Sequence, residues 1–95
     1  MKKVMINVSG RVQGVGFRYK TKNVADKIGI KGAVWNETDG SVSIEAMGTE
    51  EEIELFSAIV KSDLSPRGQV DHFVMKEAPE IKEYSKFTII YFSQK

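Results

Sequence analysis

The chain has 95 residues, 41% of them hydrophobic and 28% charged, with a formal net charge of +1, which is typical of one small globular domain (residues 1–95) with a single core. It contains no cysteine, which excludes a disulfide scaffold and a thiolate nucleophile and suits a reducing compartment. No segment is long enough to span a membrane, and residues 1–7 are too poor in apolar side chains for a signal peptide, so we expect a cytoplasmic protein without a membrane partner.

The first half of the chain predicts a strand, a glycine-rich turn, a helix and a β-hairpin. Apolar residues alternate along residues 4–9, which indicates the first strand. After the glycines of residues 10–16, apolar residues recur at helical spacing from Phe17, and Gly29 is a natural helix end. Residues 30–36 and 42–46 predict two strands joined by a turn at Thr38-Asp39-Gly40.

The second half predicts another helix and two more strands. Thr49 is a candidate N-cap, and Glu52 three residues later completes a capping box, so we interpret the acidic residues here as helix-start chemistry and not as a metal site. Residues 65–68 break the chain, residues 70–76 predict a bulged strand, and residues 87–92 predict a short final one. The order is therefore βαββαβ with one extra strand. It favours an α/β protein of the α+β sandwich kind, ferredoxin-like, with an antiparallel sheet and two helices on one face.

The candidate site is the glycine-rich run Gly10-Arg11-Val12-Gln13-Gly14-Val15-Gly16-Phe17-Arg18. Its glycines allow backbone N–H groups to turn inward at the positive end of a helix dipole, and Arg18 adds a planar cation that matches phosphate. The run is neither a P-loop nor a dinucleotide fingerprint, because it lacks Gly-Lys-Ser/Thr and a third glycine at position 19. From these residues alone, a tight turn with a surface arginine explains the run equally well.

Charge is unevenly distributed around this run. Residues 1–31 hold eight Lys/Arg and one acid, a net +7, whereas residues 32–95 hold six Lys/Arg and twelve acids, a net −6. The basic part contains the glycine run, and a positive field there attracts small anions. The alternative is a solvated helix face that carries the lysines at 20, 22, 27 and 31.

The run at residues 10–18 resembles the signature loop of the acylphosphatases, which hydrolyse carboxyl-phosphate mixed anhydrides. Residues 32–42, with Asn36, resemble the second motif of that family, which carries its catalytic asparagine, and residues 83–89 resemble its closing strand. The resemblance departs from the family pattern at Ala33 and Trp35, where many members carry a tryptophan and an arginine. Strand alternation places both on the face of the sheet away from Asn36.

The resemblance implies a role for each matching residue. The phosphoryl group rests in the N–H groups of the loop, Arg18 holds its oxygens, and Asn36 orients a water in line with the departing carboxylate. The implied phosphate-binding residues are Gln13, Gly14, Val15, Gly16, Phe17 and Arg18. Without the resemblance, Asn36 is more simply explained as a residue that caps the following turn.

The remaining residues limit the chemistry. No His, Cys or paired carboxylates have metal-ligand spacing, and we interpret His72, the sole histidine, as a half-exposed strand residue. Such a site can still cleave an acyl phosphate, because the leaving carboxylate has a solution pKa of about 4 and needs no general acid. We therefore expect an acylphosphatase without metal or cofactor, with inorganic phosphate as product and inhibitor.

Two alternatives remain at this point. A ferredoxin-like sheet can bind RNA through aromatic residues on its central strands, but residues 4–9 and 41–47 contain none, so we expect no nucleic-acid partner. Acylphosphatase-like domains also occur inside larger carbamoyl-handling maturation enzymes. The length of this chain leaves no room for further domains, which favours a free-standing enzyme, and we expect a monomer.

Overall fold

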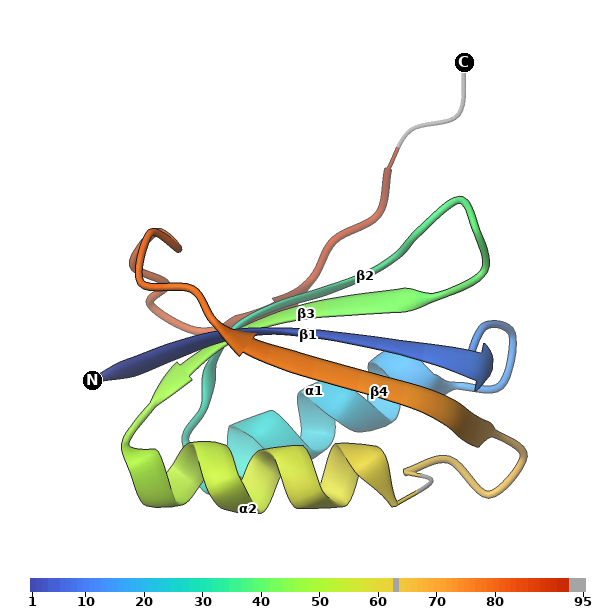
Figure 1. Cartoon of the computed structure of the whole chain (residues 1–95), viewed down its shortest axis with the longest axis horizontal. Coiled ribbons are helices and arrows are strands. Elements are labelled where there is room, and N and C mark those ends of the chain that lie inside the picture. The colour runs from blue at the N-terminus through green and yellow to red at the C-terminus, as the bar shows by residue number, and fades with distance from the viewer. Residues whose placement is uncertain (63, 93–95) are drawn as a thin grey trace.

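A computed structural model of the chain describes residues 1–62 and 64–92. Its elements are β1 (Lys2–Arg11), α1 (Phe17–Ile28), β2 (Lys31–Asn36), β3 (Val42–Gly48), α2 (Glu50–Lys61), β4 (Gln69–Glu77) and β5 (Phe87–Ile89). The strands of the described residues form one sheet in the order β4-β1-β3-β2-β5, and both helices cover the same face (Figure 1). The predicted ferredoxin-like βαββαβ order is confirmed. None of the described helices is long and apolar enough to cross a membrane.

The prediction of an antiparallel sheet is wrong for its last strand. β1 pairs antiparallel with β3 and β4, and β2 pairs antiparallel with β3, but β5 runs parallel to β2, with Phe87 beside Gly32 and Ile89 beside Val34. The sheet is mixed because residues 78–86 stay at the end of the sheet where β4 ends and β2 begins (Figure 1). β5 therefore starts beside the start of β2 and runs in the same direction.

The core lies between the helices and the face of the sheet that they cover. Alternation in β1 buries Val4, Ile6 and Val8, each at most 1% exposed, and each contributes roughly 1.5–3 kcal/mol by leaving water. Helix α2 adds Phe56, whose ring lies edge-on to Phe87 with 6.1 Å between ring centroids. The alternate strand residues project from the opposite face, where Ala33 and Ser43 are also buried.

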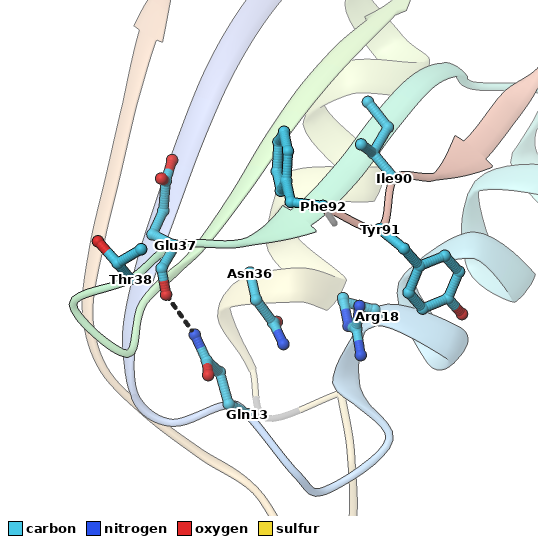
Figure 2. Close-up of a pocket in the computed structure, with 8 residues that line it drawn as sticks. All are labelled: Gln13, Arg18, Asn36, Glu37, Thr38, Ile90, Tyr91 and Phe92. Atoms are coloured by element: carbon cyan, nitrogen blue, oxygen red, sulfur yellow. Dashed lines mark hydrogen bonds between the residues drawn. The ribbon is translucent and has the colours of Figure 1, made fainter. Parts of the chain in front are cut away.

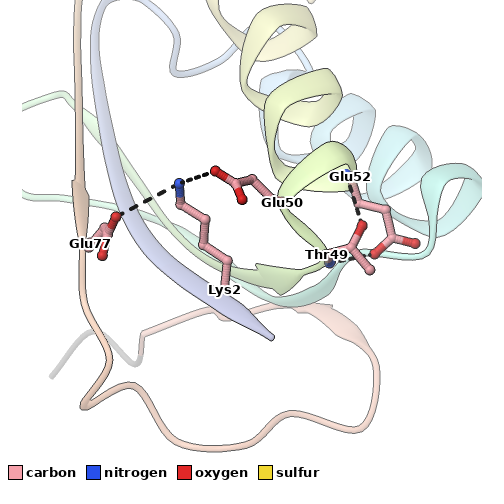
Figure 3. A network of polar contacts seen from close by, with 5 residues as sticks. All are labelled: Lys2, Thr49, Glu50, Glu52 and Glu77. Atoms are coloured by element: carbon pink, nitrogen blue, oxygen red, sulfur yellow. Dashed lines mark hydrogen bonds and ion pairs between the residues drawn. The ribbon is translucent and has the colours of Figure 1, made fainter.

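The two helices begin in different ways. Helix α2 has the predicted capping box: the Glu52 N–H donates to Thr49 Oγ1 (3.1 Å), and the Thr49 N–H donates to Glu52 Oε1 (2.8 Å) (Figure 3). Lys2 lies 3.8 Å from both Glu50 and Glu77, so it joins this helix start to β1 and β4. Helix α1 instead follows Gly16, with no hydrogen bond from a capping side chain and no acid in its first turn.

The predicted bulge in β4 is confirmed, and it directs the chain toward the site. Ser9 pairs with His72 but Gly10 pairs with Val70, so the register shifts at Asp71. Gly10 has φ 127°, and a Cβ at this position would lie 2.4 Å from Gln69 O. Glycine is therefore required for the close approach of the two strands. The bend lies immediately before the loop that connects β1 to α1.

Candidate active site

The loop between β1 and α1 leaves the start of the helix open. Gly14 (φ 76°) and Gly16 (φ 79°) are left-handed, a conformation that other residues adopt only at a cost. A Cβ at either position would meet nothing within 4 Å, so these glycines serve the backbone conformation and not close packing. The first helical bond of the turn runs from Lys20 N–H to Gly16 O (3.0 Å), so the preceding N–H groups have no acceptor within α1. Together they are free backbone donors at the positive end of the helix dipole, an arrangement that can bind an anion.

Contacts from elsewhere in the chain fix the loop at its base. Ser65 Oγ donates a hydrogen bond to Val15 O. A Cβ on Gly68 would lie 2.9 Å from Arg11 O, so the backbone of the segment after α2 packs tightly against the loop. The Val15 side chain packs against the core, which turns it away from solvent. The loop is therefore held from the α2–β4 side independently of β2.

Asn36 is the last residue of β2, where it pairs with Val42. Its Oδ1 is fully buried and is the one buried side-chain polar atom without a hydrogen-bond partner among the described residues. Such an atom costs about 1–3 kcal/mol unless something donates to it. The residue as a whole is partly exposed, so the rest of its side chain can meet a small ligand at this strand end.

Arg18 lies in the first turn of α1 and is oriented by an aromatic ring. Its guanidinium carbon is 4.9 Å from the ring centroid of Tyr91. A cation over an aromatic face is attracted by about 0.5–1 kcal/mol when exposed, which restricts the long side chain to one region. Figure 2 shows the side chains of Arg18 and Asn36 pointing toward the part of the pocket that the loop bounds.

These side chains share one pocket of about 560 Å³. It is lined by Gln13, Arg18, Asn36, Glu37, Thr38, Ile90, Tyr91 and Phe92 (Figure 2). Three predicted site residues, Gln13, Arg18 and Asn36, are thus brought together from segments that are distant in the sequence. Gly14, Gly16 and Phe17 line a smaller adjoining hollow of about 120 Å³ that also contacts Arg18 and Tyr91. Val15 lines neither of these two pockets with its side chain.

The carboxylate of Glu37 is turned away from this pocket. Its Oε2 accepts hydrogen bonds from Trp35 Nε1 (3.0 Å) and Ser43 Oγ (2.6 Å) on the face of the sheet opposite the helices. Trp35 thus projects away from Asn36, as predicted. Figure 2 shows the Glu37 side chain pointing away from Arg18, so the anion site is not opposed by the nearest acid. His72 is exposed on β4, more so than predicted, and does not line the pocket.

The described residues contain no group of three or more His, Cys, Asp or Glu that could hold a metal ion. The positive character of the pocket comes from Arg18 and from the start of α1. An arrangement with one fixed cation, open backbone donors and one unpaired amide can bind an anion with tetrahedral oxygens and hold a water beside it. It offers no side chain that is positioned as a nucleophile.

Comparison with known proteins identifies this arrangement. The family model for acylphosphatase matches residues 4–89. The chain belongs to the acylphosphatase family. It is 49% identical over 90 residues to the acylphosphatase of Enterococcus faecalis. The aligned region covers 95% of this chain and 99% of that protein. Its fold matches the crystal structure of acylphosphatase from Bacillus subtilis with a TM-score of 0.90 and 40% identity, over 96% of this chain and 100% of that one.

As a member of the acylphosphatase family, the protein is an enzyme that hydrolyses acyl phosphates. The same fold also occurs inside a larger protein. The structure of full-length HypF in its phosphate- and nucleotide-bound form matches with a TM-score of 0.87 and 38% identity, over 95% of this chain but only 12% of that chain. The match to the Enterococcus faecalis relative, in contrast, covers 99% of that protein.

Sequence reasoning missed the wall of the acylphosphatase pocket that follows β5. β5 was predicted to span residues 87–92 but ends at Ile89, although the Ile90 N–H still donates to Val34 O (2.9 Å). Tyr91 and Phe92 then leave the sheet and line the pocket, 72% and 61% exposed. The sequence signal that was available is the pair of adjacent aromatic residues Tyr91-Phe92, since strand alternation can bury only one of two neighbours on the same face.

Proposed function

We propose that the phosphoryl group of the acyl phosphate binds over the loop at residues 13–18, with its oxygens held by the backbone N–H groups and by Arg18. The open start of α1 supports this assignment, because its N–H groups lack both a capping side chain and an acid. The pocket also contains the guanidinium of Arg18, a planar donor that can bind two phosphate oxygens at once. Backbone donors and one fixed cation match the charge spread over the three transferred oxygens.

The single observation that carries the mechanism is that Asn36, a partly exposed residue whose Oδ1 has no hydrogen-bond partner in the protein, lines the same pocket as Arg18. An amide oxygen accepts a hydrogen bond but is not a base, so Asn36 orients a water and does not deprotonate it. A water held by a hydrogen bond with the Asn36 amide presents a lone pair to phosphorus. Positioning of this kind replaces much of the entropic cost of bringing nucleophile and substrate together.

The reaction then needs no acid from the protein. The water oxygen forms a bond to phosphorus while the bond from phosphorus to the acyl oxygen breaks, and the electron pair leaves with the carboxylate. The proton of the water passes to a phosphate oxygen, so the products are a carboxylate and dihydrogen phosphate. A carboxylate is a stable leaving group at neutral pH, because its conjugate acid has a pKa of about 4.

Two variants test these roles with acetyl phosphate as substrate and inorganic phosphate as inhibitor. Asn36→Ala should lower kcat severely, by about a hundredfold or more, and leave inhibition by phosphate nearly intact, because its partner is the water. Arg18→Ala should abolish turnover and weaken inhibition, because its partner is the phosphate. Near-normal turnover in either variant, or loss of phosphate inhibition in the Asn36 variant, would contradict the assignment.

The enzyme is further proposed to act as a monomer without metal or cofactor. Charge stabilisation by Arg18 and the start of α1 supplies what a divalent ion supplies in other phosphoryl-transfer sites. Prolonged dialysis against a chelator should leave kcat unchanged, and sedimentation should give the mass of one chain. Loss of activity on chelation that magnesium restores would refute the metal-independent mechanism.

A further inference from the structure

The side chain of Gln13 joins the loop to the hairpin that carries Asn36. Its Nε2 donates one hydrogen bond to Glu37 O (2.8 Å) and another to Ser41 O (2.9 Å) (Figure 2 shows the first). These two carbonyls close the β2–β3 turn, since the Glu37 N–H also donates to Ser41 O (2.8 Å). Both protons of one amide are therefore committed to the hairpin, and the first acceptor is the residue that follows Asn36.

The sheet order explains why such a link matters. The loop continues β1 and Asn36 ends β2, but β3 lies between these two strands, so no ladder of strand hydrogen bonds joins them. Among the described side-chain hydrogen bonds, those of Gln13 are the ones that connect residues 12–16 to residues 36–41. This amide is therefore the direct side-chain link between the phosphate site and the water site, beside the indirect path through Val42 of β3, which pairs with both Val8 and Asn36.

Asn36 is held through its backbone, which pairs with Val42, and not through its side-chain oxygen. Its Oδ1 has no partner in the protein, so its direction follows the backbone at the end of β2. The loop, in contrast, is also held from the other side by Ser65, whose hydroxyl donates to Val15 O. Removal of the Gln13 amide should therefore loosen the hairpin more than the loop, and displacements of about 1 Å can cost a hundredfold in rate.

We propose that Gln13 is a positioning residue whose side-chain amide sets the place of Asn36, and hence of the attacking water, relative to the phosphate site. This inference rests on the proposed function, because it requires that Asn36 orient the water. It assigns the side chain a role distinct from that of the Gln13 backbone, which belongs to the proposed phosphate site. The side chain acts through Asn36 and does not touch the reacting atoms.

The test uses Gln13→Met, which keeps the length of the side chain and removes both donors, and Gln13→Ala as a second variant. We expect kcat on acetyl phosphate to fall between about tenfold and a hundredfold, with inhibition by inorganic phosphate little changed. Gln69→Met is the matched control, because the Gln69 amide also donates a hydrogen bond, to Asp71 Oδ1 (2.8 Å), but on the exposed part of β4. Its kcat should equal that of the parent enzyme.

The double variant with Asn36→Ala decides between positioning and a separate role. If Gln13 acts through Asn36, adding Gln13→Met to Asn36→Ala should cost nothing more. Equal losses in both backgrounds would overturn the inference, as would phosphate inhibition that weakens in parallel with kcat, or loss of the folded state in both Gln13 variants by circular dichroism. If Asn36→Ala retains normal turnover, the proposed function itself fails. If Asn36→Ala is inactive but Gln13→Met is not, only the positioning role fails.

Discussion

The two ends of the sheet differ in whether they leave polar groups without a partner. At the end where β1 begins, several polar side chains have partners within the protein. These pairs are Thr49 with Glu52, Lys2 with Glu50 and Glu77, Lys3 with Glu83 (2.7 Å) and with the backbone Ile81 O (2.7 Å), and Tyr84 with Glu45 (2.6 Å). At the end where β1 enters the loop, Asn36 Oδ1 is unpaired and the start of α1 is uncapped. One end stabilises the fold, and the other is left for a ligand.

The contrast is sharpest between the two helix starts. Both carry the same partial positive charge, because it arises from the backbone. In α2 the sequence neutralises it with a capping box and the acids Glu50, Glu51 and Glu52. In α1 a glycine precedes the first turn and no acid follows, so the same potential is available to a phosphate. The site therefore depends on the absence of a capping side chain and of acids at the start of α1 as much as on the presence of Arg18 and Asn36.

The largest expected effect comes from giving α1 an acid, as α2 has. Gly16→Asp should lower kcat/KM on acetyl phosphate by about a thousandfold and nearly abolish inhibition by phosphate. Two like charges about 4 Å apart repel by about 4 kcal/mol at an effective dielectric constant of about 20. The side chain itself fits, because a Cβ at Gly16 would meet nothing within 4 Å.

Two control variants separate this charge from backbone strain. Gly16→Asn carries the same left-handed conformation, which costs about 1 kcal/mol, without the charge. Gly29→Asn places the same strain at the other end of α1, where φ is 101°. We expect the aspartate variant to be much less active than both. Equal activity of Gly16→Asp and Gly16→Asn would show that the helix start does not bind the phosphate.

The second variant removes the N-cap of α2 instead. Thr49→Ala removes the acceptor for the Glu52 N–H, and N-cap losses of this kind cost about 1 kcal/mol. In a domain of this size that lowers the melting temperature by about 4–8 °C, measured by circular dichroism. kcat should not change, because the capping box lies at the end of the sheet away from the pocket. A loss of activity without loss of stability would contradict the division between the two ends.

Much of this division could be read from the sequence. Helix ends, the capping box and the bulge follow from local rules, because Thr49, Glu52 and Gly29 act within one turn of the chain. The glycine loop and Asn36 were recognised because each lies in a motif. The parallel orientation of β5 was not predicted, because it depends on which end of the sheet residues 78–86 occupy. The position of residues 78–86 is set by tertiary packing, which leaves no periodic pattern in the sequence.

The parts of the site that were missed are also contacts between distant segments. The Gln13 side chain reaches Glu37 O and Ser41 O, 24 and 28 residues away, and a glutamine in a loop gives no sign of such acceptors. Tyr91 meets Arg18 only because the chain turns out of the sheet after Ile89. Sequence patterns report periodicity and local turns. These contacts instead depend on how the β1–α1 loop, the β2–β3 turn and the residues after β5 come together in the fold.

The third variant, Tyr84→Phe, tests the end of the sheet where β1 begins by its effect on stability at alkaline pH. Burial, followed by the hydrogen bond to Glu45 and its charge, raises the pKa of Tyr84 to about 12, whereas an unfolded tyrosine titrates near 10. The folded state thus holds this proton more tightly, so the contribution is complete below about pH 10 and is lost as the pH rises toward 12. Tyr84→Phe should cost about 0.5 kcal/mol near neutrality and should flatten the fall in melting temperature between pH 10 and 12. An equally steep fall in the variant would disprove the coupling.

For the last prediction we expect no effect at all. It concerns the pH dependence of kcat at the pocket that contains Arg18 and Asn36. In the proposed mechanism a guanidinium keeps its proton at any working pH and the Asn36 amide does not titrate. kcat should therefore be nearly flat between about pH 6 and 8, the range in which a histidine base would titrate. His72 is exposed on β4 and outside the pocket, so His72→Gln should leave both the rate and its pH profile unchanged. If the kcat profile instead shows a limb near neutral pH that His72→Gln removes, an acid–base catalyst takes part in the reaction. The pocket of Arg18 and Asn36 would then not work by positioning and fixed charge alone.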